Sequence, residues 1–210
     1  MTAKYRLVFF DVDSTLVTIE GIDVLGGGNP EVARLTEAAM NGEIPLDQVY
    51  GRRLEMIRPT RDAVDALARR YVESTAPGAE ETIRTLQSAG SAVYLVTAGI
   101  EQALVLLAAK LKAHLRAVRL RFTPSGEYED FDRRSPLTRP GGKEVVVRDI
   151  RARAHGKAAF VGDGVSDLEA KPAVDLFIGF GGVHTRPRVR ENADVFVNGP
   201  RLDEVLPYLI

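Results

Sequence analysis

The stretch Asp11-Val12-Asp13-Ser14-Thr15 decides the fold of this chain, because it directly follows the apolar run Leu7-Val8-Phe9-Phe10. Four apolar residues are too few for a buried helix, and the β-branched and aromatic side chains among them predict a central strand. Asp11 and Asp13 leave the carboxyl end of that strand, which is where open α/β sheets bind their ligands. Aspartate, serine and threonine are also common in plain turns and helix caps, so the rest of the sequence must decide.

The composition excludes several kinds of protein. The 210 residues suit one large domain or a domain with a modest insertion, and the formal net charge of -1 gives no reason to expect nucleic acid or a membrane as partner. Without cysteine there is no disulfide, no thiolate nucleophile and no cysteine zinc site. Residues 1–6 hold no signal h-region, and no apolar run approaches the roughly 18 residues of a membrane span. We therefore expect a cytoplasmic protein.

Helical patterns replace the strand pattern after Thr15. Proline and threonine starts predict three helices, over residues 30–40, 45–57 and 60–74. An apolar stripe on such helices needs a partner surface. We therefore expect a helical cap domain formed by residues 17–75, inserted after the first strand of a core domain formed by residues 1–16 and 76–210.

The remaining sequence alternates strand and helix patterns. Further strands are expected over residues 92–96, 158–161, 176–178 and 195–197, with a long helix that reaches about His114. Residues 117–128 contain a Pro-Ser-Gly turn and predict an antiparallel hairpin at a sheet edge. This order favours an α/β fold with a doubly wound, mostly parallel sheet.

Polar loops are expected to meet at one edge of that sheet. Thr97-Ala98-Gly99 follows the second strand, Gly162-Asp163-Gly164-Val165-Ser166-Asp167 follows another, and a further loop offers Lys143. The acidic cluster of Asp11, Asp13, Asp163 and Asp167 would repel itself without a cation, and oxygen-only ligands indicate Mg2+. Thr97 and Lys143 supply a hydroxyl and a compact positive charge for phosphoryl oxygens. Each residue alone also fits an ordinary turn, cap or surface position, but the joint pattern favours a site.

These four motifs, in this order, resemble those of the haloacid dehalogenase superfamily. The resemblance implies that Asp11 is a nucleophile that forms an aspartyl-phosphate, and that Asp13 is the general acid and then the general base. It implies that Thr97 and Lys143 bind the phosphoryl oxygens. The magnesium ligands that it implies are the Asp11 carboxylate, the Asp13 main-chain carbonyl and Asp163, supported by Asp167.

The likeness to phosphoserine-hydrolysing members of the superfamily runs nearly end to end. It includes Glu20-Gly21-Ile22-Asp23, Ala39-Met40, Arg53-Leu54, Gly141-Gly142-Lys143 and Phe177-Ile178-Gly179-Phe180-Gly181-Gly182. It implies a small phosphate ester as substrate, O-phospho-L-serine, whose ammonium group meets Glu20 and whose carboxylate meets Arg53. Met40 is expected to pack against the substrate stem. Without the resemblance, Glu20 and Arg53 would read as ordinary surface charges.

Two features depart from the family pattern. The second motif usually reads Ser-Gly-Gly, whereas alanine at position 98 adds a methyl group near the substrate and does not easily adopt positive φ. Ala98 and Gly99 are still expected to line the substrate site, with some shift in affinity or specificity left open. Gly26-Gly27-Gly28 is either a hinge that admits substrate or a slack surface loop.

Three other functions stay open at this point. The first is hydrolysis of another small ester, such as phosphothreonine, phosphohomoserine or a non-amino-acid substrate. The second is a signalling receiver that stores phosphate on an aspartate, although receivers have no cap and no need of an acid two residues on. The third is a catalytically silent binding protein that keeps the fold. The sequence does not indicate an oligomeric state.

Overall fold

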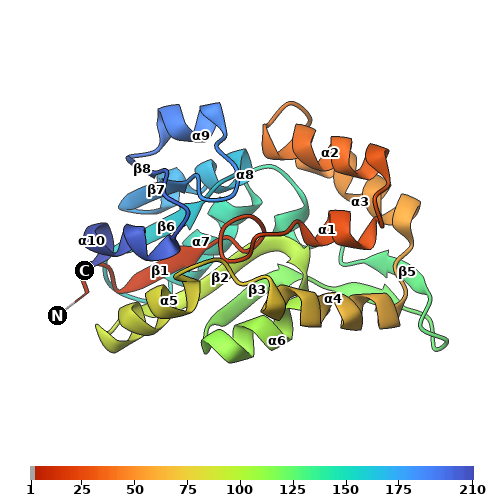
Figure 1. Ribbon diagram of the computed structural model, residues 1–210, viewed down its shortest axis with the longest axis horizontal. Coiled ribbons are helices and arrows are strands. Elements are labelled where there is room, and N and C mark those ends of the chain that lie inside the picture. The colour runs from red at the N-terminus through yellow and green to blue at the C-terminus, as the bar shows by residue number, and fades with distance from the viewer. Residues whose placement is uncertain (1–2) are drawn as a thin grey trace.

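A computed structural model describes residues 3–210 (Figure 1). Within that range six strands form one sheet, parallel throughout, in the order β3-β2-β1-β6-β7-β8, and the predicted doubly wound α/β fold is confirmed. The strands are β1 (Leu7–Phe10), β2 (Ala92–Ile100), β3 (His114–Val118), β6 (Ala158–Gly162), β7 (Leu176–Phe180) and β8 (Val195–Val197).

Strand β1 lies in the interior of this sheet and is wholly buried. It pairs in parallel with β2 on one side and β6 on the other, so that Phe10 lies opposite Leu95 and Val161. Asp11 therefore leaves the sheet next to the last residues of β2 and the loop that follows β6. The register of the sheet thus fixes which loops meet at the site.

One face of the sheet carries a row of stacked aromatic rings. Phe9 lies opposite Tyr94 of β2 and Phe160 of β6, with ring centroids 5.2 and 6.3 Å away. Phe160 in turn lies opposite Phe177 of β7, with centroids 6.0 Å apart. Cross-strand aromatic pairs add stability beyond the area that they bury. Side chains as well as backbone hydrogen bonds therefore hold these four strands together.

The helices fall into two groups along the chain. Those inserted between β1 and β2 are α1 (Gly21–Leu25), α2 (Pro30–Met40), α3 (Leu46–Ile57) and α4 (Arg61–Glu73). The others are α5 (Ala79–Ser88), α6 (Glu101–Leu111), α7 (Gly142–Arg151), α8 (Val165–Leu168), α9 (Pro187–Asn192) and α10 (Leu206–Leu209). Among residues 3–210, no helix combines the length and the apolar character that crossing a membrane requires.

The three predicted helices of the insertion are present as α2, α3 and α4. Two of them begin as the sequence indicates: the Asn29 side chain accepts a hydrogen bond from the Glu31 N–H, and the Thr60 hydroxyl accepts one from the Ala63 N–H. Such caps satisfy backbone donors that the first helical turn leaves unpaired.

The inserted segment leaves and re-enters the sheet region through two adjacent stretches of backbone. Val17 forms an antiparallel bridge with Thr75, and the Ala76 N–H donates to the Leu16 carbonyl oxygen at 2.8 Å. Figure 1 shows α1, α2 and α3 grouped on one side, while α4 runs alongside α6. The expected division into domains stays a prediction, and residues 1 and 2 of the expected core lie outside the described residues.

The predicted helix that reaches about His114 is wrong beyond Leu111. Lys112 adopts a left-handed conformation (φ 51°) that ends α6, and residues 114–118 form the edge strand β3. An edge strand exposes polar side chains such as His114 and Arg116, which hides its apolar alternation in the sequence. Strand β2 also runs on to Ile100 instead of ending at residue 96, so the second motif belongs to the strand itself.

The predicted hairpin exists, but it does not lie at the edge of the main sheet. Strands β4 (Leu120–Phe122) and β5 (Tyr128–Phe131) form a separate antiparallel sheet next to the inserted helices (Figure 1). Phe131 packs edge-on against Tyr50 of α3, with ring centroids 5.0 Å apart, and Arg58 donates to the Tyr128 carbonyl oxygen. These aromatic and polar contacts with α3 hold the hairpin away from the main sheet.

The aromatic row predicts a large stability cost for one truncation. Phe160→Ala removes a fully buried ring that stacks on both Phe9 and Phe177, and should lower the free energy of unfolding by about 3–5 kcal/mol. Urea unfolding followed by circular dichroism measures the loss, with Val145→Ala at an exposed position as the control. A loss no larger than that of the control would contradict this account of the sheet.

Candidate active site

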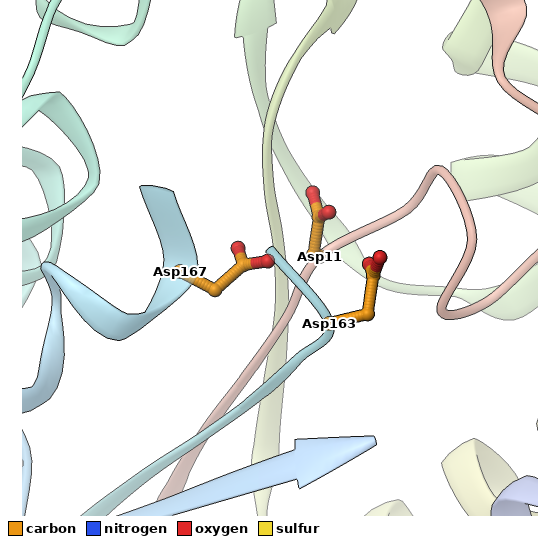
Figure 2. Close-up of side chains that lie close together, drawn as sticks. All are labelled: Asp11, Asp163 and Asp167. Atoms are coloured by element: carbon orange, nitrogen blue, oxygen red, sulfur yellow. The ribbon is translucent and has the colours of Figure 1, made fainter. Parts of the chain in front are cut away.

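Three buried carboxylates meet at the carboxyl edge of the sheet (Figure 2). Asp11 follows β1, Asp163 follows β6, and Asp167 lies in α8, and one oxygen of each lies within 4.8 Å of the others. Each residue is at most 2 % exposed. The structure therefore joins three of the four predicted acidic residues through their side chains.

Two cations partly balance this cluster. The Lys143 ammonium donates to Asp11 Oδ1 at 2.7 Å and also to Asp167, while Arg186 Nε donates to Asp163 Oδ2 at 3.2 Å. Burial opposes the charge on Lys143, but the Asp11 and Asp167 carboxylates raise its pKa above the ordinary value. These pairs leave the cluster one positive charge short of neutrality.

The cluster has the chemistry of a divalent metal site. Burial, followed by the neighbouring carboxylates, raises the pKa of Asp163 well above its ordinary value, and burial and Asp11 raise the pKa of Asp167 to about 7. These directions mean that the buried negative charges lack compensation, which a bound cation would supply. Because all the donors are carboxylate oxygens, the residues fit a hard ion such as Mg2+.

Asp13 lies beside this cluster with its side chain held separately. Its Oδ1 accepts hydrogen bonds from the Gly21 N–H and from the Tyr71 hydroxyl, both at 2.8 Å. Burial and the nearby Asp11 carboxylate raise the pKa of Asp13 to about 6. A carboxyl group with such a pKa can both donate and accept a proton near neutrality.

The serine and threonine of the first motif hold other site residues in place. The Ser14 hydroxyl donates to Glu20 Oε1 at 2.6 Å, and the Thr15 hydroxyl donates to Asp163 Oδ1 at 3.1 Å. Ser14 has φ of 55°, a conformation that non-glycine residues rarely adopt and that places its hydroxyl near Glu20. The motif therefore orients Glu20, a candidate substrate-binding residue, and Asp163, a candidate metal ligand.

One cavity brings the predicted catalytic and substrate residues together. Its lining includes Asp11, Asp13, Glu20, Met40, Arg53, Thr97, Ala98, Gly99 and Lys143. The inserted segment supplies Glu20, Met40 and Arg53, and its Tyr50 donates a hydrogen bond to the Ala98 carbonyl oxygen at 2.9 Å. The cavity thus lies between the sheet edge and the inserted helices, and the roles of these residues stay predictions.

Arg53 is a buried guanidinium without an ion-pair partner among residues 3–210. It is 6 % exposed, its Nη1 donates to the Thr36 hydroxyl at 3.1 Å, and its Nε has no hydrogen-bond partner among the described residues. Thr36 in turn donates to Asp23 Oδ1 at 2.6 Å. A buried donor left unpaired costs free energy, so this arrangement fits a group that receives an anionic ligand.

The second motif accommodates alanine without backbone strain. Neither Ala98 nor Gly99 has positive φ, so the expected conformational difficulty at position 98 does not arise. The glycines of the last motif make room for the protein's own side chains. A Cβ atom at Gly162 would overlap the Asp167 carboxyl group, and one at Gly164 would come within 2.7 Å of Met40 Cε.

Sequence reasoning missed three residues that hold the site together. Tyr71 occupies an apolar stripe of α4 and reads as a core residue, and Thr36 lies in the middle of α2 without any motif. Arg186 is one of many arginines, yet it bridges Asp163 to Glu37 and Asn41 of the inserted segment. Each acts through a partner far away in the chain, which the sequence alone does not reveal.

A family model for haloacid dehalogenase-like hydrolases matches residues 8–170, which include all four motifs. This chain belongs to the haloacid dehalogenase-like hydrolase family. Phosphoserine phosphatase of Mus musculus is 38% identical over 197 residues, with 90% of this chain and 88% of the relative covered. The human phosphoserine phosphatase is 36% identical with the same coverage.

Solved structures of haloacid dehalogenase-like hydrolases share the fold. A phospho-aspartyl intermediate analogue of phosphoserine phosphatase superposes with a TM-score of 0.87 at 28% identity, and covers 99% of this chain and 100% of that one. A substrate-bound phosphoserine phosphatase complex also gives 0.87, at 27% identity and 99% coverage of both chains. The predicted family membership is confirmed.

The charge balance of this haloacid dehalogenase-like site predicts stabilisation by metal. Mg2+ at about 100 times its dissociation constant should stabilise the folded protein by about 2.7 kcal/mol. Thermal unfolding of chelator-treated protein with and without Mg2+ measures the effect. Asp163→Asn should remove most of it, whereas Asp149→Asn, at an exposed ion pair, should keep it. An unchanged response in Asp163→Asn would rule out this cluster as the metal site.

Proposed function

We propose that this chain is a magnesium-dependent phosphomonoesterase that hydrolyses O-phospho-L-serine to serine and phosphate. The observation that carries the substrate assignment is the buried guanidinium of Arg53, which has no ion-pair partner among residues 3–210 and lines the same cavity as Asp11 and Glu20. A cation and a carboxylate in one cavity match the carboxylate and ammonium of an amino acid. The names of the relatives and of the substrate-bound neighbour agree with this substrate.

Chemistry would begin with attack by an Asp11 carboxylate oxygen on phosphorus. The phosphorus–oxygen bond to the seryl group breaks, and Asp13 gives its proton to the departing seryl oxygen. Water then attacks the phosphorus of the aspartyl-phosphate and loses a proton to Asp13, which frees Asp11 and inorganic phosphate. Each residue thus returns to its starting state.

Positioning and charge would account for most of the rate enhancement. The Thr97 hydroxyl and the Lys143 ammonium would bind phosphoryl oxygens. Both residues line the cavity, and the Thr97 hydroxyl accepts a hydrogen bond from the Gly99 N–H. Magnesium held by the Asp11 and Asp163 carboxylates and the Asp13 carbonyl, with Asp167 in support, would add positive charge that favours phosphoryl transfer.

The inserted residues 17–75 would act as a cap over the core formed by 1–16 and 76–210. Support comes from the paired backbone at Val17 and Thr75, where a small rotation would move the whole insertion. Gly27 and Gly28 both have positive φ, and an added Cβ at either would meet no atom within 4 Å, so these two glycines lie outside the cavity.

The cytoplasmic location stays a prediction.

A substrate panel tests the proposed function. Magnesium-dependent phosphate release should be at least about tenfold more efficient, by kcat/KM, for L-phosphoserine than for D-phosphoserine, phosphothreonine, phosphoethanolamine or sugar phosphates. Asp11→Asn, which cannot form the aspartyl-phosphate, should release no phosphate from any of them. Equal turnover of all esters would contradict the assignment of phosphoserine as substrate and would indicate a phosphatase without that preference. Full turnover by Asp11→Asn would overturn the covalent mechanism.

Replacement of Arg53 should separate substrate recognition from chemistry. Arg53→Gln removes the charge that would meet the substrate carboxylate, so kcat/KM for phosphoserine should fall by about 10²-fold, and much less for p-nitrophenyl phosphate. Arg52→Gln is the matched control, because Arg52 lies next to it on α3 but is exposed and pairs with Glu31. Equal losses on both substrates would mean that Arg53 does not read the carboxylate.

A further inference from the structure

Tyr71 makes a contact with Asp13 that none of the sequence motifs predicts. It lies in the last turn of α4, is 1 % exposed, and its hydroxyl donates to Asp13 Oδ1 at 2.8 Å across 58 residues of sequence. Tyr71 is therefore a hydrogen-bond donor to this carboxyl group.

The two oxygens of Asp13 have different surroundings. Oδ1 accepts from both Tyr71 and the Gly21 N–H, whereas Oδ2 faces the second motif. A Cβ atom added at Gly99 would lie 3.2 Å from Asp13 Oδ2 and 3.2 Å from Thr97 Oγ1, which places that oxygen on the side of the phosphoryl-binding residues. One oxygen is thus anchored and the other is presented to the cavity.

Gly21 makes this arrangement sterically possible. A Cβ atom at position 21 would overlap the Tyr71 hydroxyl, so a larger residue would displace the ring from Asp13. The absence of a side chain lets the Gly21 N–H and the Tyr71 hydroxyl converge on the same oxygen. Both donors come from the inserted segment, and the acceptor comes from the loop after β1.

We propose that Tyr71 is a positioning residue that anchors Asp13 Oδ1 and thereby reserves Oδ2 for proton transfer to the departing alcohol. The carboxyl torsion of aspartate is broad and roughly two-fold, so a single donor would leave the group freer to rotate. Two donors on one oxygen restrict that rotation before substrate binds. The inference rests on the proposed function, because it assigns the proton donor of that reaction.

Leaving-group dependence tests the proposal. Serine needs a proton when it departs, whereas p-nitrophenolate does not. In Tyr71→Phe, the single-turnover rate of phosphoserine cleavage should fall by about 10- to 100-fold with little change in KM. The pre-steady-state burst of p-nitrophenol should change by less than about threefold. Equal slowing of both substrates, or of neither, would overturn the role of Tyr71.

The control is Tyr128→Phe, which also removes a buried tyrosine hydroxyl. The Tyr128 hydroxyl lies in the hairpin and has no hydrogen-bond partner in the part of the chain that the structure describes, so this variant should keep both rates. Wild-type turnover of phosphoserine reports separately on the proposed function. If the wild type cleaves only another alkyl phosphate, the same comparison is made with that ester.

The orientation of the Asp13 carboxyl group tests the role of Tyr71 independently of the substrate. In a crystal structure of Tyr71→Phe, the Asp13 carboxyl group should rotate or occupy two conformers. An Asp13 side chain that keeps a single orientation, with Oδ2 still facing the second motif, would show that the Gly21 N–H suffices and would overturn the role assigned to Tyr71.

Discussion

The structure depends on keeping several carboxylates buried at one point. Removing charges from water costs several kcal/mol for each ion unless partners compensate, and here Lys143 bridges Asp11 and Asp167 while Arg186 holds Asp163. These contacts link the loops after β1 and β6 to α7, α8 and the residue before α9. The Lys143 ammonium also lies 6.0 Å from the ring centre of Phe160, so the aromatic row and the charged cluster share a boundary. The packing of the sheet and the arrangement of the charged site therefore depend on each other.

The same requirement explains why the site needs both parts of the molecule. The sheet edge provides the groups proposed to bind the phosphoryl group and the metal, and the inserted segment provides Glu20, Met40 and Arg53. Polar contacts cross the boundary at several places, among them Tyr71 with Asp13, Tyr50 with the Ala98 carbonyl, and Arg186 with Glu37. A chain without ordered inserted helices would keep the acidic cluster and lose the groups that surround a substrate.

Much of this arrangement was predictable because it follows from local patterns. The run Leu7–Phe10 is apolar throughout and is buried on both faces, and the starts of α2 and α4 have recognisable caps. The edge strand β3 was missed, since its alternation is weak and the break at Lys112 depends on a left-handed residue that carries a side chain. Arg53 was found through the family resemblance alone, whereas Tyr71 and Arg186 depend on tertiary contacts across 58 and 23 residues. Local periodicity therefore predicts the elements and motifs, while the residues that orient them emerge only from the packing.

The paired backbone at Val17 and Thr75 has a consequence for how such a molecule can vary. Because the two ends of the insertion meet, the insertion is a closed loop with respect to the sheet. The entropic cost of closing a loop grows only logarithmically with the length of the loop. Lengthening, shortening or exchanging the inserted segment would therefore cost the sheet little. The part proposed to carry the chemistry can stay constant over evolutionary time while the part proposed to select the substrate diverges.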